Sequence, residues 1–250
     1  MRLHVTGATG YLGSELVRLR PDASTERVEV RDADAVRALF ERVRPDVAIH
    51  TAYRQDEADV NVEGSENVAR AAAATKTRLV HLSTDVVFDG RKGAPYVEDD
   101  PLSPVTDYGR AKAEAEVRVS AAHPGALLVR TSLIYGGATP SKHELSARAA
   151  SHPFFTNEIR SPIQVGDLAA ALLELAALDV SGPLHVAGGD AVSRADFAEL
   201  VVGAPVRIET ASDERPLDCT LDSSRAQALL RTRLRGIREV LARRVWRNIG

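Results

Sequence analysis

Residues 3–13, with the sequence LHVTGATGYLG, decide the fold of this chain. The apolar run Leu3–Thr6 has the length of a short buried strand, and a helical pattern follows over Tyr11–Leu19. Between them, glycines at positions 7, 10 and 13 form a turn that joins the strand directly to the helix. Backbone N–H groups at such a turn, together with the positive end of the helix, would face an anion such as a pyrophosphate.

Glycine suits this turn for two physical reasons. The first glycine permits the tight turn, and the others let the backbone and a ligand approach closely. A glycine triplet alone is a weak signal, and the alternative is an ordinary strand-to-helix turn. Because this triplet opens the first strand–turn–helix unit of the chain, it favours a dinucleotide site.

Strand-like and helical stretches alternate along the first half of the chain. Further strands are expected at Arg27–Arg31, Val47–His50, Arg78–Ser83 and Ala126–Arg130, with helices at Ala35–Val43, Val62–Ala74 and Thr106–Ala121. The strands read as apolar runs, as parallel strands buried on both faces do. The pattern therefore predicts an α/β fold, a Rossmann-like doubly wound parallel sheet with a small C-terminal substrate lobe.

The second half of the chain is less regular. After residue 136 prolines interrupt the pattern, and helices are expected at Val165–Leu178 and Ser193–Val202. We expect residues 1–135 to form a dinucleotide-binding domain, with returns to its sheet from about 160–187, and residues 136–250 to form mainly a substrate-binding lobe. The tail Arg231–Arg247 reads as an amphipathic helix with a basic face, with Trp246 packed on the body of the protein.

Composition narrows the classes of function. With 250 residues, 44% of them hydrophobic, the chain can bury a substantial core. Its net charge is −3 and its arginines are scattered, so no basic stripe indicates a nucleic-acid partner. Cys219 is the only cysteine, so no intramolecular disulfide can form, and no metal is expected. No long apolar segment follows Met1 or occurs elsewhere, which favours a cytoplasmic protein without a membrane span.

Tyr108 and Lys112 are candidates for catalysis. They stand four residues apart in an expected helix, so both side chains can meet at one substrate atom. A tyrosine has a reference pKa of about 10 and must be activated to exchange protons near neutral pH. A neighbouring lysine ammonium would favour the phenolate and so lower that pKa. The alternative, a surface pair of side chains, is disfavoured by the position directly after the fourth strand.

Small polar residues end the strand that precedes this helix. Residues 81–90 read HLSTDVVFDG, which places Ser83, Thr84 and Asp85 at the carboxyl end of a parallel strand. Ligand crevices of open α/β sheets lie at these ends. A hydroxyl of Ser83 or Thr84 could donate a hydrogen bond to a substrate carbonyl oxygen as negative charge develops on it. The alternative is that these residues cap the following turn.

Together these elements resemble the extended short-chain dehydrogenase/reductase family, and within it the dTDP-4-dehydrorhamnose reductase group. The glycine spacing G-x-x-G-x-x-G is typical of that family. The group's pattern continues in RPDVAIHTA at 44–52, PYVE at 95–98, YGRAK at 108–112, RTS at 130–132, RSPIQVGDL at 160–168 and RP at 215–216. The match covers most of the chain and is most specific between Ser83 and Lys112.

The resemblance implies NAD(P)H-dependent reduction of a keto group on a nucleotide-linked 4-keto deoxysugar. Tyr108 would donate the proton, Lys112 would bind the nicotinamide ribose and lower the pKa of Tyr108, and Thr84 would polarise the carbonyl. The residues implied in cofactor binding are Gly7, Thr9, Gly10, Tyr11, Leu12, Gly13, Asp32, Ala33, Thr51, Ala52, Asn61 and Ser83, together with Tyr108 and Lys112. The residues implied in substrate binding are Tyr53, Asp85, Val86, Leu133, Arg160 and Arg215, with both arginines at the nucleotide part.

Several features depart from the group's pattern. Val86 and Leu133 stand where an aromatic residue and a tryptophan usually shape the sugar pocket, so the sugar need not be the rhamnose precursor. Only one strand fits before Asp32, where two are usual, so no residue that reads the adenosine 2′ position is identified. The choice between NADP and NAD stays open, with NADPH slightly favoured. The candidates for contact with a 2′-phosphate are Arg18, Arg20 and Arg31.

Two other functions stay open. One is a sugar-nucleotide epimerase or dehydratase. Dehydratases of this family need a glutamate where this chain has Val86, and epimerising members use a cysteine–histidine pair, whereas Cys219 is remote in the sequence. The other is a non-catalytic NADP-binding regulatory subunit, which the intact Tyr-Lys-Thr set disfavours. The expected partner is a small-molecule nucleotide sugar, and a homodimer is also open.

Overall fold

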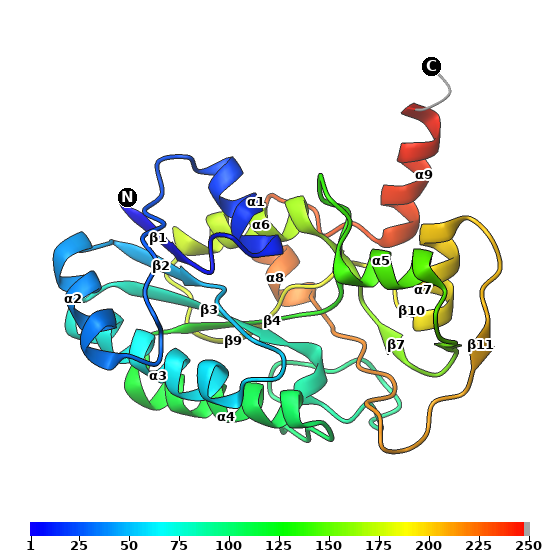
Figure 1. The fold of residues 1–250 in the computed structure, drawn as a ribbon, viewed down its shortest axis with the longest axis horizontal. Helices are drawn as coiled ribbons and strands as arrows, with labels where there is room; N and C mark the ends of the chain where they lie inside the picture. The colour runs from blue at the N-terminus through cyan, green and yellow to red at the C-terminus, as the bar shows by residue number, and fades with distance from the viewer. Residues whose placement is uncertain (248–250) are drawn as a thin grey trace.

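A sheet of five parallel strands forms the centre of the molecule (Figure 1). The computed structural model describes residues 1–247, and the side chains as far as residue 242. The strands, in spatial order, are β1 (Leu3–Thr6), β2 (Val47–His50), β3 (Arg78–Thr84), β4 (Leu127–Thr131) and β9 (Gly182–His185). Every neighbouring pair is parallel, so the carboxyl ends of all five strands meet at one edge of the sheet.

Helices cover both faces of this sheet (Figure 1). On one face lie α1 (Tyr11–Leu19) and α6 (Val165–Ala176), and toward the other lie α2 (Ala33–Val43), α3 (Ala58–Ala74) and α4 (Asp107–Ala122). Each face has its own apolar core, one built with α1 and α6 and the other with α2, α3 and α4. The doubly wound α/β arrangement predicted from the sequence is confirmed.

The strand expected at Arg27–Arg31 is not formed, and that prediction is wrong. Only Ser24 pairs with β1, through one N–H and one C=O. The apolar pattern has another cause, because Val30 is buried in the core beneath α2 and α3. Its carbonyl accepts a hydrogen bond from Asn67 Nδ2 at 3.0 Å, so a side chain takes the place of a neighbouring strand.

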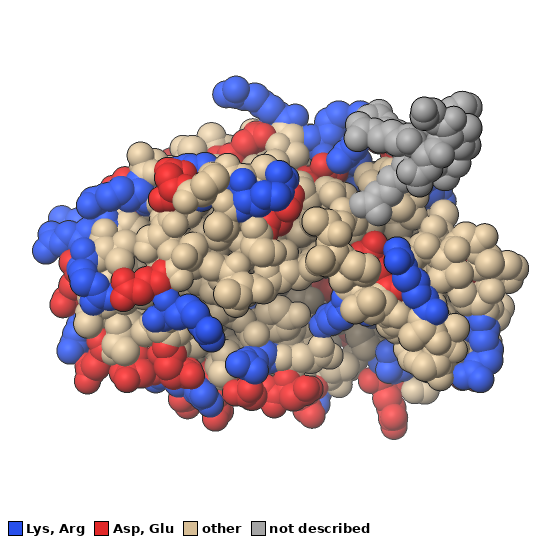
Figure 2. Space-filling model, turned by 45° about the horizontal axis from the view of Figure 1, so that its top comes forward, with Lys and Arg blue, Asp and Glu red and all other residues tan. Residues whose placement is uncertain are grey.

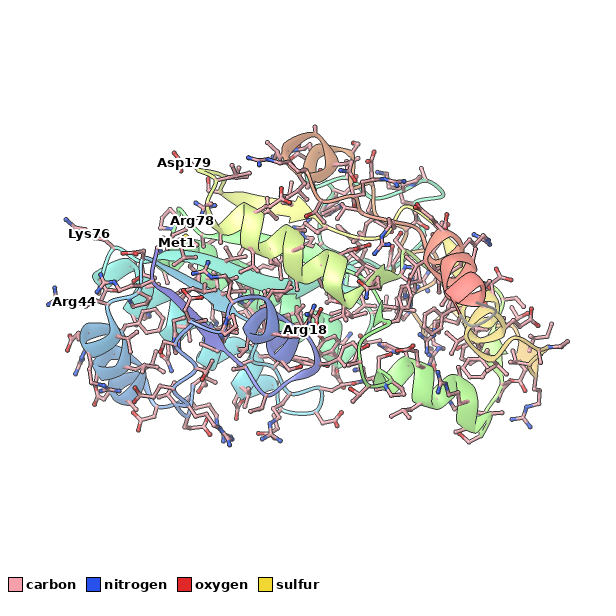
Figure 3. The ribbon with its side chains drawn as sticks, turned by 90° about the horizontal axis from the view of Figure 1, so that it is seen from above. Met1, Arg18, Arg44, Lys76, Arg78 and Asp179 are labelled. Atoms are coloured by element: carbon pink, nitrogen blue, oxygen red, sulfur yellow. The ribbon has the colours of Figure 1, made fainter. Side chains whose placement is uncertain are left out.

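A smaller lobe stands beyond the carboxyl edge of the sheet (Figure 1). Its strand pairs are β5 (Ile134–Tyr135) with β8 (Ile163–Gln164), β6 (Phe154–Phe155) with β11 (Ile208–Glu209), and β7 (Ile159–Arg160) with β10 (Val192–Ser193). Its helices are α5 (Lys142–Ala149), α7 (Arg194–Val202) and α9 (Ile237–Arg247), while α8 (Ser224–Leu229) contacts β9. Figure 3 shows Met1, Arg44, Lys76, Arg78 and Asp179 at the opposite end of the molecule, where strands begin.

Polar side chains explain where several helices begin. Asp32 starts α2 and Thr106 starts α4, each accepting a hydrogen bond from a backbone N–H group of the first turn. Ser141 and Ser193 form capping boxes at α5 and α7.

The end of the chain differs from the expectation. The C-terminal helix begins at Ile237 and not at Arg231, since Asp190 Oδ2 accepts a hydrogen bond from Arg238 N at 2.8 Å and fixes the start there. Ile237 is buried in the core of the lobe. The side chain of Trp246 lies outside the described residues. Among residues 1–247, no helix is both long enough and apolar enough to cross a membrane.

The expected division at residue 135 stays a prediction. Both α6 and β9 follow residue 135 in the sequence, yet they complete the main sheet and one of its cores. On the face drawn in Figure 2, acidic and basic side chains are mixed over the part that holds the sheet.

Candidate active site

The glycine turn lies between β1 and α1, at the carboxyl edge of the sheet. Gly7 has a positive φ of 70°, and a Cβ there would lie 2.7 Å from Ala52 N. A Cβ on Gly13 would overlap the Gly7 carbonyl oxygen. Both glycines are therefore required by the packing of the turn itself.

Gly10 differs from its two neighbours in the turn. A Cβ on Gly10 would meet only the Gly7 carbonyl oxygen, at 3.1 Å, and the rest of its surroundings within 4 Å is open. Gly10 is the N-cap of α1 and supplies no side-chain hydrogen bond to the first turn of that helix. The start of α1 thus offers backbone N–H groups to an anion, which is the fit that a pyrophosphate requires.

Other residues of the turn have separate places. Thr9 is exposed, whereas the Leu12 side chain belongs to the core, so only the backbone of Leu12 can reach a ligand. Tyr11 Oη accepts a hydrogen bond from Gly137 N at 2.7 Å and so joins the turn to the lobe. Asp32 uses one carboxylate oxygen to cap α2, in which Ala33 is the first residue.

The residues after β2 line the other side of the turn. Thr51 Oγ1 donates to Thr6 O at 2.7 Å, and Ala52 packs on Gly7. Asn61 is buried, and both ends of its amide bond to the backbone of Arg54, at 2.5 and 3.1 Å. In the structure Asn61 therefore holds the loop that precedes α3, instead of presenting its amide to a ligand.

Tyr108 lies in the first turn of α4, beside the 3-10 turn η1 (Asp85–Val87). A Cβ on Gly109 would overlap the Val86 carbonyl oxygen, so this glycine lets α4 approach η1 closely. The Tyr108 ring stands 6.1 Å from the ring of Tyr53, which is 46% exposed. Burial raises the pKa of Tyr108, and Tyr53 and Asp85 raise it further.

Lys112 is buried one turn further along α4. Its Nζ donates to Leu82 O at 2.5 Å and lies 3.5 Å from His81 Nε2. Burial lowers the pKa of Lys112 to about 8, opposed by Glu116. The pKa of Tyr108 is thus raised, whereas the sequence predicts a lowering by Lys112, and burial is the first cause of the rise.

Ser83 and Thr84 point to different sides of β3. Ser83 is buried and donates to Glu116, which forms a buried ion pair of 2.9 Å with Arg130. Its hydroxyl therefore serves the packing of α4 on the sheet. The half-buried Thr84 hydroxyl donates to Asp85 Oδ1 at 3.1 Å and accepts a hydrogen bond from Val86 N at 3.4 Å, so in the structure it caps the turn η1.

Asp85 is a buried carboxyl at the same strand end. It accepts a hydrogen bond from Ser132 Oγ at 2.6 Å and lies 3.8 Å from Arg160 Nε. Burial raises its pKa, while Arg160 and Ser132 oppose the rise. Val86 and Leu133 are both partly buried, and Leu133 packs in the core of the lobe.

The two arginines expected at the nucleotide part of a substrate are placed differently. Arg160 is 4% exposed, and its guanidinium donates to the carbonyls of Ile159, Pro216 and Leu217 at 2.5 to 2.8 Å. These bonds hold β7 against residues 216–217, which argues against the expected contact of Arg160 with a diphosphate. Arg215 is half exposed and donates to the buried Glu158.

Three arginines considered for a 2′-phosphate already have acidic partners. Arg18 pairs with Glu15 at 2.7 Å, Arg20 with Asp22 at 2.8 Å and Arg31 with Glu29 at 2.9 Å. Only Arg31 directly precedes Asp32, so it is the best placed of the three to contact a 2′-phosphate.

Sequence reasoning missed a group of titratable residues in the lobe. Arg194, Glu158 and His143 come from α7, the segment before β7, and α5. Arg194 N donates to Glu158 O at 2.8 Å, and Arg194 Nη1 lies 3.4 Å from His143 Nδ1. No motif signals them, since the pairing of β7 with β10 brings Arg194 to Glu158, and the packing of α5 against α7 adds His143.

A glycine turn at the start of a helix, beside a tyrosine–lysine helix at the carboxyl edge of a parallel sheet, defines a dinucleotide-binding protein of the Rossmann class. The chain belongs to the family described as the RmlD substrate binding domain, whose model matches residues 1–248.

Relatives cover most of the chain. It is 33% identical to the dTDP-4-dehydrorhamnose reductase of Mycolicibacterium smegmatis over 275 residues, 96% of this chain and 84% of that protein. It is 32% identical over 224 residues to a probable dTDP-4,6-dihydroxy-2-methyloxan-3-one 4-ketoreductase of Streptomyces antibioticus, 80% of this chain and 76% of that protein.

Solved structures have the same fold. A hypothetical dTDP-4-dehydrorhamnose reductase from Sulfolobus tokodaii is 30% identical, with a TM-score of 0.80 over 94% of this chain and 97% of that one. A dTDP-4-dehydrorhamnose reductase from Bacillus anthracis in complex with NADP has a TM-score of 0.84 over 97% of each chain. Its identity of 24% shows a common fold alone.

Proposed function

We propose that this protein is an NAD(P)H-dependent reductase that reduces the keto group of a nucleotide-linked 4-keto deoxysugar, with NADPH as the favoured cofactor. One observation carries the proposal. Tyr108 and Lys112 on α4, and Thr84 at the end of β3, share the carboxyl edge of the sheet with the glycine turn. The names of the relatives support the same reaction.

The cofactor would supply the hydride when bound, and the backbone around Gly10 would hold its pyrophosphate. Tyr108 would donate its proton to the substrate oxygen. A tyrosine with its ordinary pKa of about 10 is protonated at neutral pH, and burial raises the pKa of Tyr108 further, so Tyr108 rests in the form that a proton donor needs. The Thr84 hydroxyl would turn from Asp85 to donate a hydrogen bond to the same oxygen. The ammonium of Lys112 would stabilise the phenolate left on Tyr108.

The alternatives fit the structure less well. An epimerase that uses a cysteine is disfavoured, since Cys219 is buried, donates to Phe88 O at 3.4 Å and has a pKa raised to about 12 by burial. A dehydratase is disfavoured by the apolar Val86 beside Asp85. A regulatory subunit would need no proton donor, and the placement of Tyr108 argues against it.

The proposal is tested by turnover. Purified protein is mixed with NADPH or NADH and a panel of nucleoside-diphosphate 4-keto-6-deoxysugars, and loss of reduced nicotinamide is followed by its absorbance. We expect oxidation that depends on the keto sugar and is faster with NADPH. Cofactor binding without turnover of any keto sugar would instead support a regulatory subunit. A cytoplasmic location and a homodimer stay predictions.

A further inference from the structure

Arg194, the first residue of α7, forms no ion pair within 4.0 Å with any side chain that the structure describes. The pairing of β7 with β10 sets Arg194 opposite Glu158, to whose carbonyl its backbone N–H donates. The side chain packs with its guanidinium 5.9 Å from the centre of the Phe197 ring and with Nη1 3.4 Å from His143 Nδ1. Neither neighbour carries a negative charge.

The charges around Arg194 leave an excess cation. Glu158 forms an ion pair with Arg215, and its Oε2 lies 3.9 Å from Arg160 Nη2. Asp85 Oδ2 lies 3.8 Å from Arg160 Nε. Among the described residues, Arg194 forms no ion pair within 4.0 Å. Three arginines thus share two carboxylates, and one of the three is left over.

The electrostatics agree with this count. Burial lowers the pKa of Arg194 to about 10; the positive charges of Arg160 and Arg215 add to the lowering, while Glu158 and Asp85 oppose it. His143 is neutral at pH 7, because burial and Arg194 lower its pKa to about 3. A partly buried guanidinium that forms no ion pair is costly, and an anionic ligand would relieve that cost.

We propose that Arg194, together with Arg215, binds the diphosphate of a nucleoside-diphosphate substrate, and that Arg160 acts only as a positioning residue for Asp85 and residues 216–217. This assignment rests on the proposed function and names the residues that read the substrate class. Arg194 N donates to Glu158 O, two residues before Arg160, and Arg160 Nε lies 3.8 Å from Asp85 at the end of β3, so this part of the lobe adjoins the strand ends. Forked guanidinium donors suit a diphosphate, above all where water is excluded.

The experiment measures binding of thymidine diphosphate and uridine diphosphate by calorimetry, with thymidine as the ligand that lacks phosphates. We expect Arg194→Gln to weaken diphosphate binding about tenfold or more, as loss of a charge-assisted contact does. Binding of thymidine and of NADPH should stay as in the wild type. In turnover, KM for the keto sugar should rise more than kcat falls. The matched control is Arg148→Gln, an exposed arginine of the same lobe, which should change nothing.

Each outcome decides between the proposals. If Arg194→Gln binds both diphosphates as the wild type does, or if the wild type binds neither, the role of Arg194 is overturned. If the diphosphates bind through Arg194 but no keto sugar is reduced, the assignment of Arg194 stands and the proposed reaction fails. Should Arg194→Gln not fold, Arg194→Met retains an apolar contact with Phe197 and should show the same loss of affinity.

Discussion

Tyr108 and Lys112 have opposite pKa shifts for the same physical reason. Lys112 is buried and Tyr108 is partly buried, and burial disfavours the charged form of each group, which is the phenolate of Tyr108 and the ammonium of Lys112. Tyr108 therefore stays protonated over the whole physiological range. The pKa of Lys112, about 8, leaves most of the lysine charged at pH 7.

Replacing Tyr108 should separate chemistry from binding. We expect Tyr108→Phe to lower kcat about a hundredfold or more, because the proton donor is lost while the ring and its packing remain. NADPH affinity, measured by calorimetry on the same preparation, should change less than about threefold, since the glycine turn is untouched. Near wild-type turnover in this variant would remove Tyr108 from the mechanism.

Lys112 should make stability depend on pH in a defined window. Its pKa in the folded protein, about 8, lies below its ordinary value of 10.5. Between these values the unfolded chain binds more protons than the folded one, so folding stability rises with pH. We expect the difference in free energy of unfolding, wild type minus Lys112→Met, to increase by up to about 3 kcal/mol between pH 8 and 10.5.

Urea unfolding of both proteins across that range gives the difference. The exposed Lys76 provides the control, because Lys76→Met should show no such pH dependence (Figure 3). A constant difference between the wild type and Lys112→Met would show that Lys112 titrates near its ordinary pKa.

The role of a residue could be predicted from the sequence where its partner is close in the chain, and could not where its partners are distant in the chain. Tyr108 and Lys112 are about one helix turn apart, so a short sequence motif is enough to identify the pair. Arg160 has its partners at 216–217, and Arg194 receives its setting from Glu158 across a strand pair. The sequence places an arginine at each position without indicating whether a protein group already occupies its donors.

Among the elements, the turn between β1 and α1 separates two kinds of glycine. We expect Gly13→Ala to reduce the free energy of unfolding by about 1–3 kcal/mol, since its Cβ would overlap the Gly7 carbonyl oxygen. Gly10→Ala should change stability by less than about 1 kcal/mol but abolish NADPH binding, because the methyl group would occupy the ligand side of the turn.

Urea unfolding and NADPH titration of the two variants provide the comparison. Unchanged NADPH affinity in a folded Gly10→Ala protein would make this an ordinary strand-to-helix turn.

Strands could be predicted from the sequence where a buried apolar segment also has hydrogen-bonded neighbouring strands. The parallel strands β2, β3 and β4 are apolar because helices cover them on both faces, and their positions agree with the expected runs. Residues 27–31 have the same apolar character, yet Val30 is buried without a strand partner. A hydrophobic pattern indicates burial, but a strand also needs backbone partners in register. In the segment before α2, only Ser24 has such a partner, in β1.

At the scale of the whole molecule, the order of the sheet links the two halves of the chain. The expected boundary at residue 135 follows the loss of regular alternation in the sequence. In space, β9 pairs with β4, and α6 contacts β2 and β3, so the second half supplies one edge of the sheet and most of one core. The sequence predicts such returns at about 160–187, the range that contains α6 and β9, although periodicity alone does not separate a helix of the main sheet from a helix of the lobe.

The chain should therefore not divide into separately folding parts at residue 135. A fragment of residues 1–135 lacks α6, whose Leu168, Leu172 and Leu175 are fully buried against the sheet. Loss of these three buried side chains alone removes about 5–9 kcal/mol of hydrophobic stabilisation, which equals much of the free energy of unfolding of a typical domain. We expect fragment 1–135 to show no cooperative urea transition by circular dichroism and no NADPH binding, whereas residues 1–250 unfold cooperatively and bind NADPH. A fragment that unfolds in one sharp transition and retains NADPH affinity would establish residues 1–135 as an independent domain.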